Sequence, residues 1–448
     1  MNTSPERKEE ATLLPTMGLA ALVIYGVGDM LGSGIYALIG KAAGVMGNTI
    51  WLGFLTSMVA ALLTGLSYAS LGSRYPRAAG AAYVTQRAFR RSFLAYVVGL
   101  AVVASGLTSF STQTRAFAGY FQGMVGMSIA PEVIILGFIA VLSFINFWGM
   151  REATWLNVLC TTVEVAGLVI VVLVGLRFWG GVNYMETPVT ASGAVTALGI
   201  PLILQGAVLT FYSFVGFEDM INVVEEVKNP RHVFPRAVVL ALAITTVIYI
   251  AVSVTAVSVL PHAELAASEQ PLVDVVRRAA PWFPPVAFSF ISLFAITNTA
   301  LLNYIMGSRM VYGMARQGLV PRALGNVHPT RRTPHIAVLA LMAVVTVLAF
   351  VGDISSLARA TSVLLLGVFI VVNAALVVLK MRPSEPQGTL EVPVIVPLGG
   401  IVVCTALLFH ATPEAFRIAG WLVLGIALLY AVMRPKTVVE DDVAEAAP

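Results

Sequence analysis

The chain has 448 residues, of which 58% are hydrophobic and only 11% are charged. Because soluble domains carry roughly 25% charged residues, this composition excludes an ordinary soluble protein and indicates an integral membrane protein. The formal net charge is +4, but the lysines and arginines lie in short breaks between apolar runs and form no basic stripe, so we do not expect nucleic-acid binding. Both cysteines, Cys160 and Cys404, lie inside apolar runs without metal-ligand spacing, and no metal or cofactor is predicted.

The apolar runs predict an all-α polytopic fold. A hydrocarbon core about 30 Å thick requires about 20 apolar residues of helix. Twelve segments approach or exceed this length: 17–40, 48–72, 92–122, 131–149, 153–177, 197–224, 236–260, 286–308, 335–351, 357–379, 393–411 and 415–433. The charged stretch 1–16 lacks a convincing small-residue cleavage site, so we expect the first segment to be a retained span and not a signal peptide.

The positions of the basic residues predict the orientation of the chain. If the N-terminus is cytoplasmic, most of the 27 lysines and arginines fall in loops on the inner side of the membrane. The positive-inside rule therefore predicts that the tails 1–16 and 434–448 are both cytoplasmic, and we expect the protein in the cell membrane.

The first hydrophobic segment is interrupted by "GVGDMLGSGIY", residues 26–36. A broken helix is tolerated in lipid only where the freed backbone groups are buried in protein or line a polar cavity, so this break is a candidate binding site. Gly28, Gly32 and Gly34 permit backbone torsions and close approaches that other residues resist. The alternative is that Gly28 and Gly32 form a small-residue helix-packing face.

The start of the outer half of this segment is a candidate anion site. The backbone amides around Ser33, Gly34 and Ile35 would direct the positive end of a helix dipole toward an anion such as a carboxylate. The Ser33 hydroxyl would add another hydrogen-bonding group.

A second interruption occurs in the sixth segment, within "LTFYSFVGFEDMINVVEEVKNPRHVFPRAV", residues 209–238. Gly216 is flanked by aromatic residues and followed at once by Glu218 and Asp219. Interrupted spans in corresponding positions of two halves indicate an inverted-repeat transporter with its substrate near the membrane midplane.

A few carboxylates fall at lipid depth, where an ionisable group is costly and is by default a functional hypothesis. They are Asp29, Glu164, Glu218 and Asp219. Glu164, in the middle of the fifth segment, could bind a proton, complement a cationic substrate, or pair with Arg115 or Arg359. Desolvation favours the neutral form of such a carboxyl, so proton coupling through Glu164, helped by Glu218, is one hypothesis; freed carbonyls beside Asp29 could instead form a sodium site.

Three motifs resemble those of the amino acid, polyamine and organocation permeases. They are "GSGIY" in the first segment, "FVGFED…EEVKNPRHVFPRAV" in the sixth, and "SRMVYGMARQGLVPRALGNVHPTRRTPHIAV" after the eighth. The resemblance covers nearly the whole chain. It implies the LeuT-type fold of two inverted five-helix repeats, 17–177 and 197–379, followed by two further helices at 393–433. It also implies transport of amino acids or related amines.

The resemblance further implies site residues. Gly32, Ser33 and Gly34 would bind the substrate carboxylate, and carbonyls near Val27, Tyr212 and Phe214, beside the break at Gly216, would receive the α-ammonium group. Tyr212 or its neighbour Phe211 would form an aromatic lid. Relatives often place lysine or a small polar residue where this chain has Glu164. The chain departs from the family pattern here, so that pattern does not identify its coupling ion.

The sequence favours a secondary active amino acid transporter over other membrane proteins. The spans contain no Ser, His and acid set and no H-E-x-x-H pattern, so no catalytic residues are predicted. A channel would favour repeated filter sequences or charged rings. Proton-coupled symport is our expectation, with an exchanger or a non-transporting amino acid sensor as alternatives; neutral and cationic substrates are not distinguished.

Overall fold

The computed structural model describes residues 17–75, 80–126, 129–148, 153–189, 196–316, 318–329, 331, 333–433 and 435. These residues form helices and no β-strand, apart from an isolated bridge between Met17 and Val227. The all-helical fold class predicted from the sequence is therefore confirmed.

The first part of the chain forms seven α-helices in the described residues. They are α1 (Leu19–Leu31), α2 (Ser33–Met46), α3 (Ile50–Arg74), α4 (Gly80–Phe89), α5 (Ser92–Val125), α6 (Pro131–Trp148) and α7 (Ala153–Gly175). Short 3-10 helices follow α2 and α7, namely η1 (Gly47–Thr49) and η2 (Leu176–Phe178). Helix α2 extends beyond position 40, where the sequence predicted the first segment to end, and stops at Gly47, whose φ of 63° is unfavourable for other residues.

The second part begins with α8 (Ile200–Phe211), which is followed by the 3-10 helices η3 (Tyr212–Phe214) and η4 (Phe217–Glu226). The remaining elements are α9 (Pro230–Val259), α10 (His262–Ala267), α11 (Pro271–Ala279), α12 (Pro285–Arg316), η5 (Arg322–Gly325), α13 (His335–Val351), α14 (Ile354–Lys380), α15 (Ile395–Phe409) and α16 (Pro413–Met433).

Many of these helices can cross a bilayer. The described residues contain nine helical segments that are long and apolar enough to span a membrane, and three shorter apolar helices, α1, α13 and α15. Each segment predicted from the sequence coincides with one helix or with two or three consecutive ones. The long apolar helices identify a multi-pass membrane protein.

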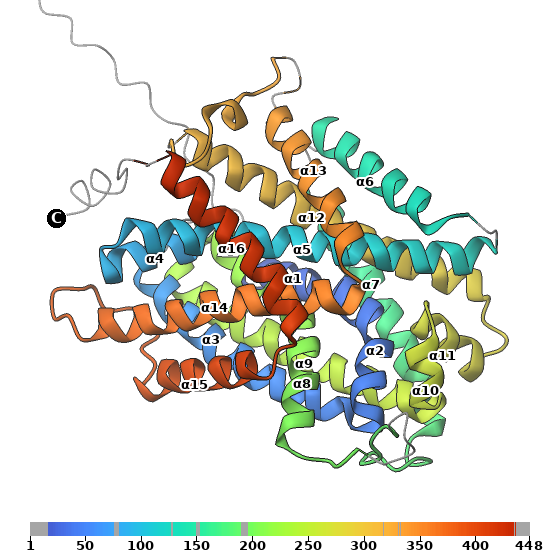
Figure 1. Cartoon of the computed structure of the whole chain (residues 1–448). Coiled ribbons are helices and arrows are strands. Elements are labelled where there is room, and N and C mark those ends of the chain that lie inside the picture. The colour runs from blue at the N-terminus through green and yellow to red at the C-terminus, as the bar shows by residue number, and fades with distance from the viewer. Residues whose placement is uncertain are drawn as a thin grey trace, which may run out of the picture.

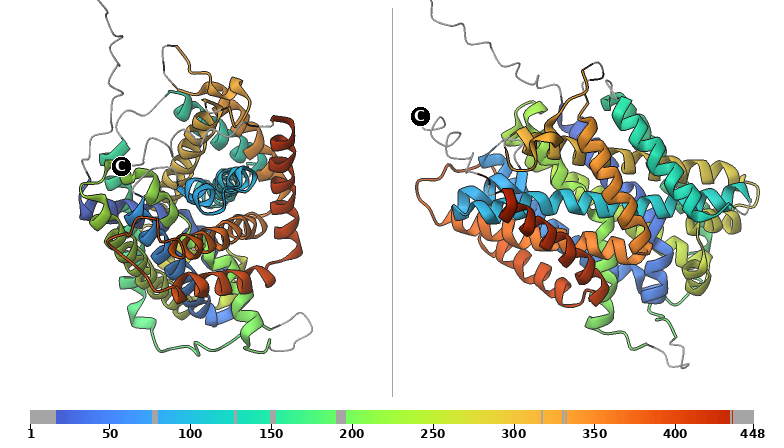
Figure 2. Two further views of the ribbon diagram at one scale, coloured as in Figure 1. Left: turned by 90° about the vertical axis from the view of Figure 1, so that its left-hand side faces the viewer. Right: turned by 45° about the horizontal axis from the view of Figure 1, so that its top comes forward.

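The helices are arranged around α5, which runs through the centre of the molecule (Figure 1) and is seen nearly end-on in the left view of Figure 2. Helix α5 packs against α12 and α14, while α3 packs against α9 and α8. Helix α16 lies at the periphery. In this arrangement the second half of α1, most of α2 and most of the segment after α8 are buried, so both predicted breaks are surrounded by protein.

An ion cluster joins the ends of α3 and α14 to the segment that precedes α15. Arg74, whose side chain is 5% exposed, donates a hydrogen bond to Glu391 over 2.5 Å, and Lys380 also pairs with Glu391. Partial burial alone would raise the pKa of the Glu391 carboxyl, but the hydrogen bonds from Arg74, Lys380 and the Gly388 N–H outweigh it and lower the pKa to about 2. The Glu391 carboxyl is therefore ionised at neutral pH.

We expect Glu391→Gln to lower the free energy of unfolding at pH 7 by about 1 to 3 kcal/mol, because the buried Arg74 guanidinium loses a charged acceptor. Since the folded pKa lies below the ordinary value, Glu391 stabilises fully above about pH 4.5 and loses this contribution as the pH falls toward 2. Melting curves of the purified protein between pH 7 and pH 3 test this. Glu414→Gln, at an exposed pair with Arg417, is the control; equal melting temperatures of wild type and Glu391→Gln at pH 7 would contradict the prediction.

Candidate functional site

The first helix break lies between α1 and α2. Gly32, with φ −54° and ψ −121°, leaves the helical conformation, and α2 begins at Ser33 without a side chain that caps its first amides. A Cβ atom on Gly34 would lie 2.6 Å from the Cα atom of Ser213, so the two breaks touch here. The amides of Ser33, Gly34 and Ile35 begin this half-helix, while the side chain of Ser33 lies outside the described part of the structure.

The second break follows α8. The chain turns through η3, becomes extended at Val215, and then passes through Gly216 at φ 125° before η4 begins. This positive φ strongly favours glycine. The Gly216 amide donates a hydrogen bond to the Glu218 carboxylate over 2.9 Å. A Cβ atom on Gly216 would lie 3.0 Å from Cγ of Asp29, so the missing side chain admits Asp29 beside the second break.

A tyrosine of α9 joins the two breaks. The Tyr249 hydroxyl lies 2.5 Å from the carbonyl oxygen of Met30 and 2.6 Å from that of Ser213. Its ring packs against Phe54 and Phe214 with ring centroids 5.2 Å apart in each case. Carbonyls released by helix breaks need donors when they are buried, and the single O–H proton of Tyr249 is shared between these two. The sequence alone does not identify Tyr249, since a single tyrosine in an apolar span is also typical of core packing.

We expect Tyr249→Phe to destabilise the purified protein by about 1 to 3 kcal/mol, because two buried carbonyls lose their shared donor while the ring is kept. Melting temperature in detergent measures the effect. The control is Tyr430→Phe in α16, because the Tyr430 ring packs on Phe93 and its hydroxyl bonds to no described residue. Identical melting curves for wild type and Tyr249→Phe would refute the proposed clamp.

Both breaks line one central cavity with a volume of about 10 Å³, about the space of one water molecule. The lining residues are Asp29, Met30 and Gly34 from the first break, Tyr212, Val215 and Gly216 from the second, Ser109 and Gln113 from α5, and Thr299 and Asn303 from α12. A larger molecule can bind here only if these elements move apart.

The two candidate lid residues occupy different places. Tyr212 lines the central cavity, and its hydroxyl lies 3.0 Å from Oγ of Ser109. Phe211 is fully buried and packs edge-on against Phe369, with ring centroids 6.0 Å apart. Val27 and Phe214 are buried beside the breaks but do not line the cavity. Tyr212 is therefore the aromatic residue positioned to contact a ligand in this cavity.

Several polar atoms around the breaks lack partners. Gln113 donates a hydrogen bond from Nε2 to Ser109, but its Oε1 has no hydrogen-bond partner in the described structure. The same holds for Oδ2 of Asp29 and Oγ of Ser213. Buried polar groups without partners are rare in native proteins. Three of the unpartnered buried atoms in the described structure thus lie at the two breaks, which makes this region a candidate binding site.

Glu164 of α7 is completely buried. Its Oε1 accepts a hydrogen bond from Nδ2 of Asn298 in α12 over 3.1 Å, whereas Oε2 has no partner among the described residues. Neither arginine considered from the sequence forms an ion pair with Glu164; Arg115 instead donates to the carbonyl of Ala349. Of the alternatives considered from the sequence, pairing with an arginine does not occur among the described residues, where Asn298 is the partner of one carboxylate oxygen.

Glu218, the other predicted coupling residue, lies beside a second small cavity. This cavity of about 20 Å³ shares Val215 and Asn303 with the central one and is also lined by Glu218 and Asp219. The central cavity is thus continued on one side by a space that carboxylates border. No cluster of histidines, cysteines or carboxylates suited to a metal occurs in the described ranges.

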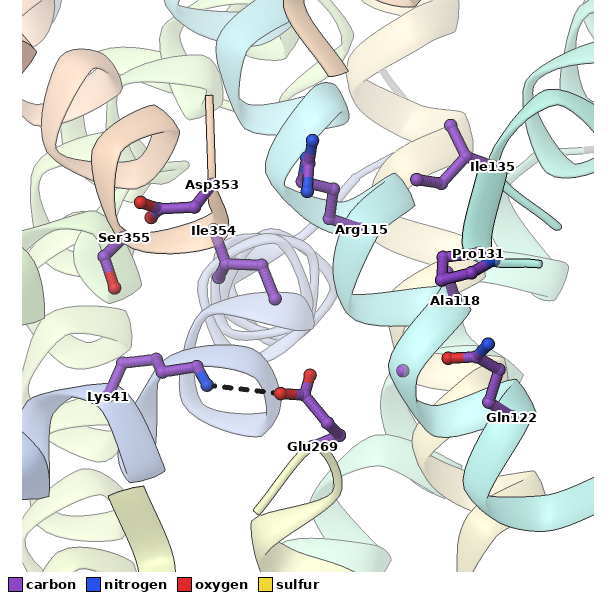
Figure 3. A pocket seen from close by; sticks show the side chains of 11 residues that line it. Lys41, Arg115, Ala118, Gln122, Pro131, Ile135, Glu269, Asp353, Ile354 and Ser355 are labelled. Carbon is purple, nitrogen blue, oxygen red and sulfur yellow. Dashed lines mark ion pairs between the residues drawn. The ribbon is translucent and has the colours of Figure 1, made fainter. Parts of the chain in front are cut away.

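A larger cavity of about 510 Å³ lies between α2, α5 and the beginning of α14 (Figure 3). Lys41 of α2 forms an ion pair of 3.5 Å with Glu269, which precedes α11. Arg115 of α5 and Asp353 before α14 also line the cavity. Acidic and basic side chains therefore surround an opening large enough for a small polar molecule.

These features define a multi-pass membrane protein whose interrupted helices meet at an interior cavity. The chain belongs to the amino acid permease family, whose model matches residues 16–432. The resemblance drawn from the three sequence motifs is thereby confirmed.

Two of the three relatives below match over nearly their whole length. An uncharacterised transporter of Mycobacterium tuberculosis is 31% identical, covering 93% of this chain and 91% of the relative. A branched-chain amino acid permease of Bacillus subtilis is 22% identical, covering 95% and 94%. Cationic amino acid transporter 4 of Mus musculus is 28% identical, covering 86% of this chain and 62% of the relative. The relatives are named for transport and not for catalysis.

Proposed function

We propose that the chain is a secondary active transporter that moves amino acids across the cell membrane by alternating access. The observation that supports this most strongly is the meeting of two helix breaks at one small interior cavity, with no N-cap side chain on the first amides of α2. Interrupted helices of this kind form midplane substrate sites in transporters. Relatives named for branched-chain and for cationic amino acids support the substrate class.

The proposed architecture has twelve spans with both termini in the cytoplasm. The repeats comprise 17–177 and 197–379, and α15 and α16 lie outside them. Helix pairs that would hold equivalent positions in the two repeats pack against each other, α3 with α9 and α5 with α12, as expected for elements beside a two-fold axis. The twelve spans are the nine long helical segments and the three shorter apolar helices, with α2 counted together with α1 and α3 counted as a span of its own.

The proposed substrate pose uses both breaks. The substrate carboxylate binds the amides of Ser33, Gly34 and Ile35, where the helix dipole favours an anion. Carbonyls of the second break receive the α-ammonium group, and Tyr212 covers the occupied site. Because the cavity holds only about 10 Å³, binding separates the breaks, and this separation is the proposed first step of alternating access.

We assign proton coupling to Glu164. The carboxyl is fully buried, has one free oxygen, and forms no ion pair with any described cation. It can therefore exist in a neutral state at lower cost than a carboxylate fixed beside arginine. Asn298 Nδ2 donates to the other oxygen in either protonation state. Exchange without a coupling ion is the alternative.

Counterflow in liposomes tests transport itself. Purified protein is reconstituted with unlabelled amino acid inside, and transient accumulation of labelled amino acid is followed over time. A transporter accelerates exchange when both sides are loaded, whereas a channel does not and a sensor moves nothing. Absence of counterflow for every amino acid tested would overturn the proposal.

A further inference from the structure

We infer that Asp29 binds a side-chain cation of the substrate, and that the substrates are basic amino acids. This inference rests on the proposed function and specifies its substrate class. Asp29 lines the central cavity and is 8% exposed. Its Oδ2 atom has no hydrogen-bond partner in the described structure.

The structure gives the Asp29 carboxylate no counter-charge. None of the ion pairs among the described residues includes Asp29, Glu164 or Glu218. The nearest backbone is the second break, which approaches closely because Gly216 has no side chain. A buried carboxylate without a cation or hydrogen-bond donors is strongly destabilising, so a ligand that supplies both would bind favourably.

The polar atoms around the cavity require donors. Besides Asp29, Gln113 presents an Oε1 atom that accepts no hydrogen bond. An ammonium group has three donors and no acceptor, and a guanidinium has five. Either group carries enough donors for both oxygens, whereas an apolar or ionised acidic side chain carries none.

The charges of the substrate also favour a basic side chain. In the proposed pose, the amides of α2 and the carbonyls of the second break satisfy the two α-groups, whose charges cancel. Glu164 accepts a proton, and Glu218 accepts the Gly216 amide. Asp29 has no ion-pair partner among the described residues, and its Oδ2 has no hydrogen-bond donor there; a neutral amino acid provides no side-chain cation. One positive charge on the side chain completes the site.

The position of Asp29 relative to the start of α2 fits such a molecule. Asp29 lies before the break at Gly32 and Gly34 lies after it, and both line the same central cavity. An amino acid whose α-carboxylate lies at the start of α2 can therefore reach Asp29 with an amine at the end of a short methylene chain. Lysine and ornithine have this form.

Matched substrate pairs test the inference. Lysine differs from norleucine, and ornithine from norvaline, by the terminal ammonium group alone. With purified full-length protein, we expect wild type to bind lysine at least about tenfold more tightly than norleucine, because a desolvated charge pair contributes strongly to affinity. Asp29→Asn should lose most of this preference, whereas Glu414→Gln at the exposed start of α16 should keep it.

The outcomes separate this inference from the proposed function. If wild type binds norleucine as tightly as lysine and exchanges it in liposomes, the inference is wrong and the transport function stands. If Asp29→Asn keeps the full lysine preference, Asp29 is not the counter-ion. If no amino acid binds or exchanges, the proposed function itself fails. If Asp29→Asn aggregates in size-exclusion chromatography, Asp29→Ser replaces it. The ratio of lysine to norleucine affinity of the wild type still tests the substrate class.

Discussion

Gly34→Val is expected to abolish amino acid uptake while the protein still reaches the membrane. The added Cβ atom would lie 2.6 Å from Cα of Ser213, and backbone at that distance cannot yield as a flexible side chain can. The valine would force the two breaks apart and cover the first amides of α2. Uptake of labelled substrate, normalised to the amount of protein in the membrane, measures the effect.

Gly137→Val is the matched control for this substitution. Gly137 lies within α6, and a Cβ atom there meets nothing within 4 Å, so uptake should stay near the wild-type level. Normal uptake by Gly34→Val would contradict the proposed carboxylate site at the start of α2. A chemical companion uses substrate methyl esters, which lack the anion and should compete poorly; competition equal to that of the free acid would indicate a site that recognises the amine alone.

The positions of the helix breaks could be predicted because they conflict with their surroundings. Carboxylates inside an apolar span almost always face the protein interior, and glycines beside them permit the helix to break there. The glycines near Asp29 and before Glu218 therefore already indicated interrupted helices in the interior. Only the distribution of residue types along the chain is needed for that inference. The family motifs added the roles of the neighbouring amides.

The partners of these residues could not be predicted in the same way. Whether Tyr249 or Asn298 faces the site depends on the rotation of α9 and α12 about their axes, which is set by packing across the whole bundle. Both helices are apolar on most sides, so their sequences define no unique inner face. The same limit explains why Arg115 was considered for Glu164, although it bonds to Ala349 instead.

Phe211 and Tyr212 illustrate a finer limit. They are adjacent, and both are aromatic, so the sequence offered either as the lid. In the structure α8 ends at Phe211 and a 3-10 turn begins at Tyr212. This change of helix type turns Tyr212 toward Ser109 and leaves Phe211 against Phe369.

Glu164→Gln is expected to abolish substrate accumulation driven by a pH gradient. Glutamine has nearly the shape of a protonated glutamate and can still accept the hydrogen bond from Asn298, but it cannot release a proton. A gradient of one pH unit stores about 1.4 kcal/mol, which for one coupled proton allows about tenfold accumulation. The variant should therefore bring labelled amino acid to equal concentrations on the two sides of the membrane, without accumulation.

Exchange between two loaded compartments distinguishes lost coupling from a damaged protein, because exchange needs the occupied carrier to reorient but needs no net proton movement. Glu164→Gln should retain exchange, whereas a misfolded variant would lose it together with accumulation. Glu414→Gln removes one carboxylate from the exposed start of α16 and should retain both activities. If Glu164→Gln still concentrates substrate under a pH gradient without sodium, the coupling proton binds elsewhere. If wild type requires sodium or performs only exchange, the buried carboxyl of Glu164 has a different role, and its free oxygen must be explained by the substrate or by another ion.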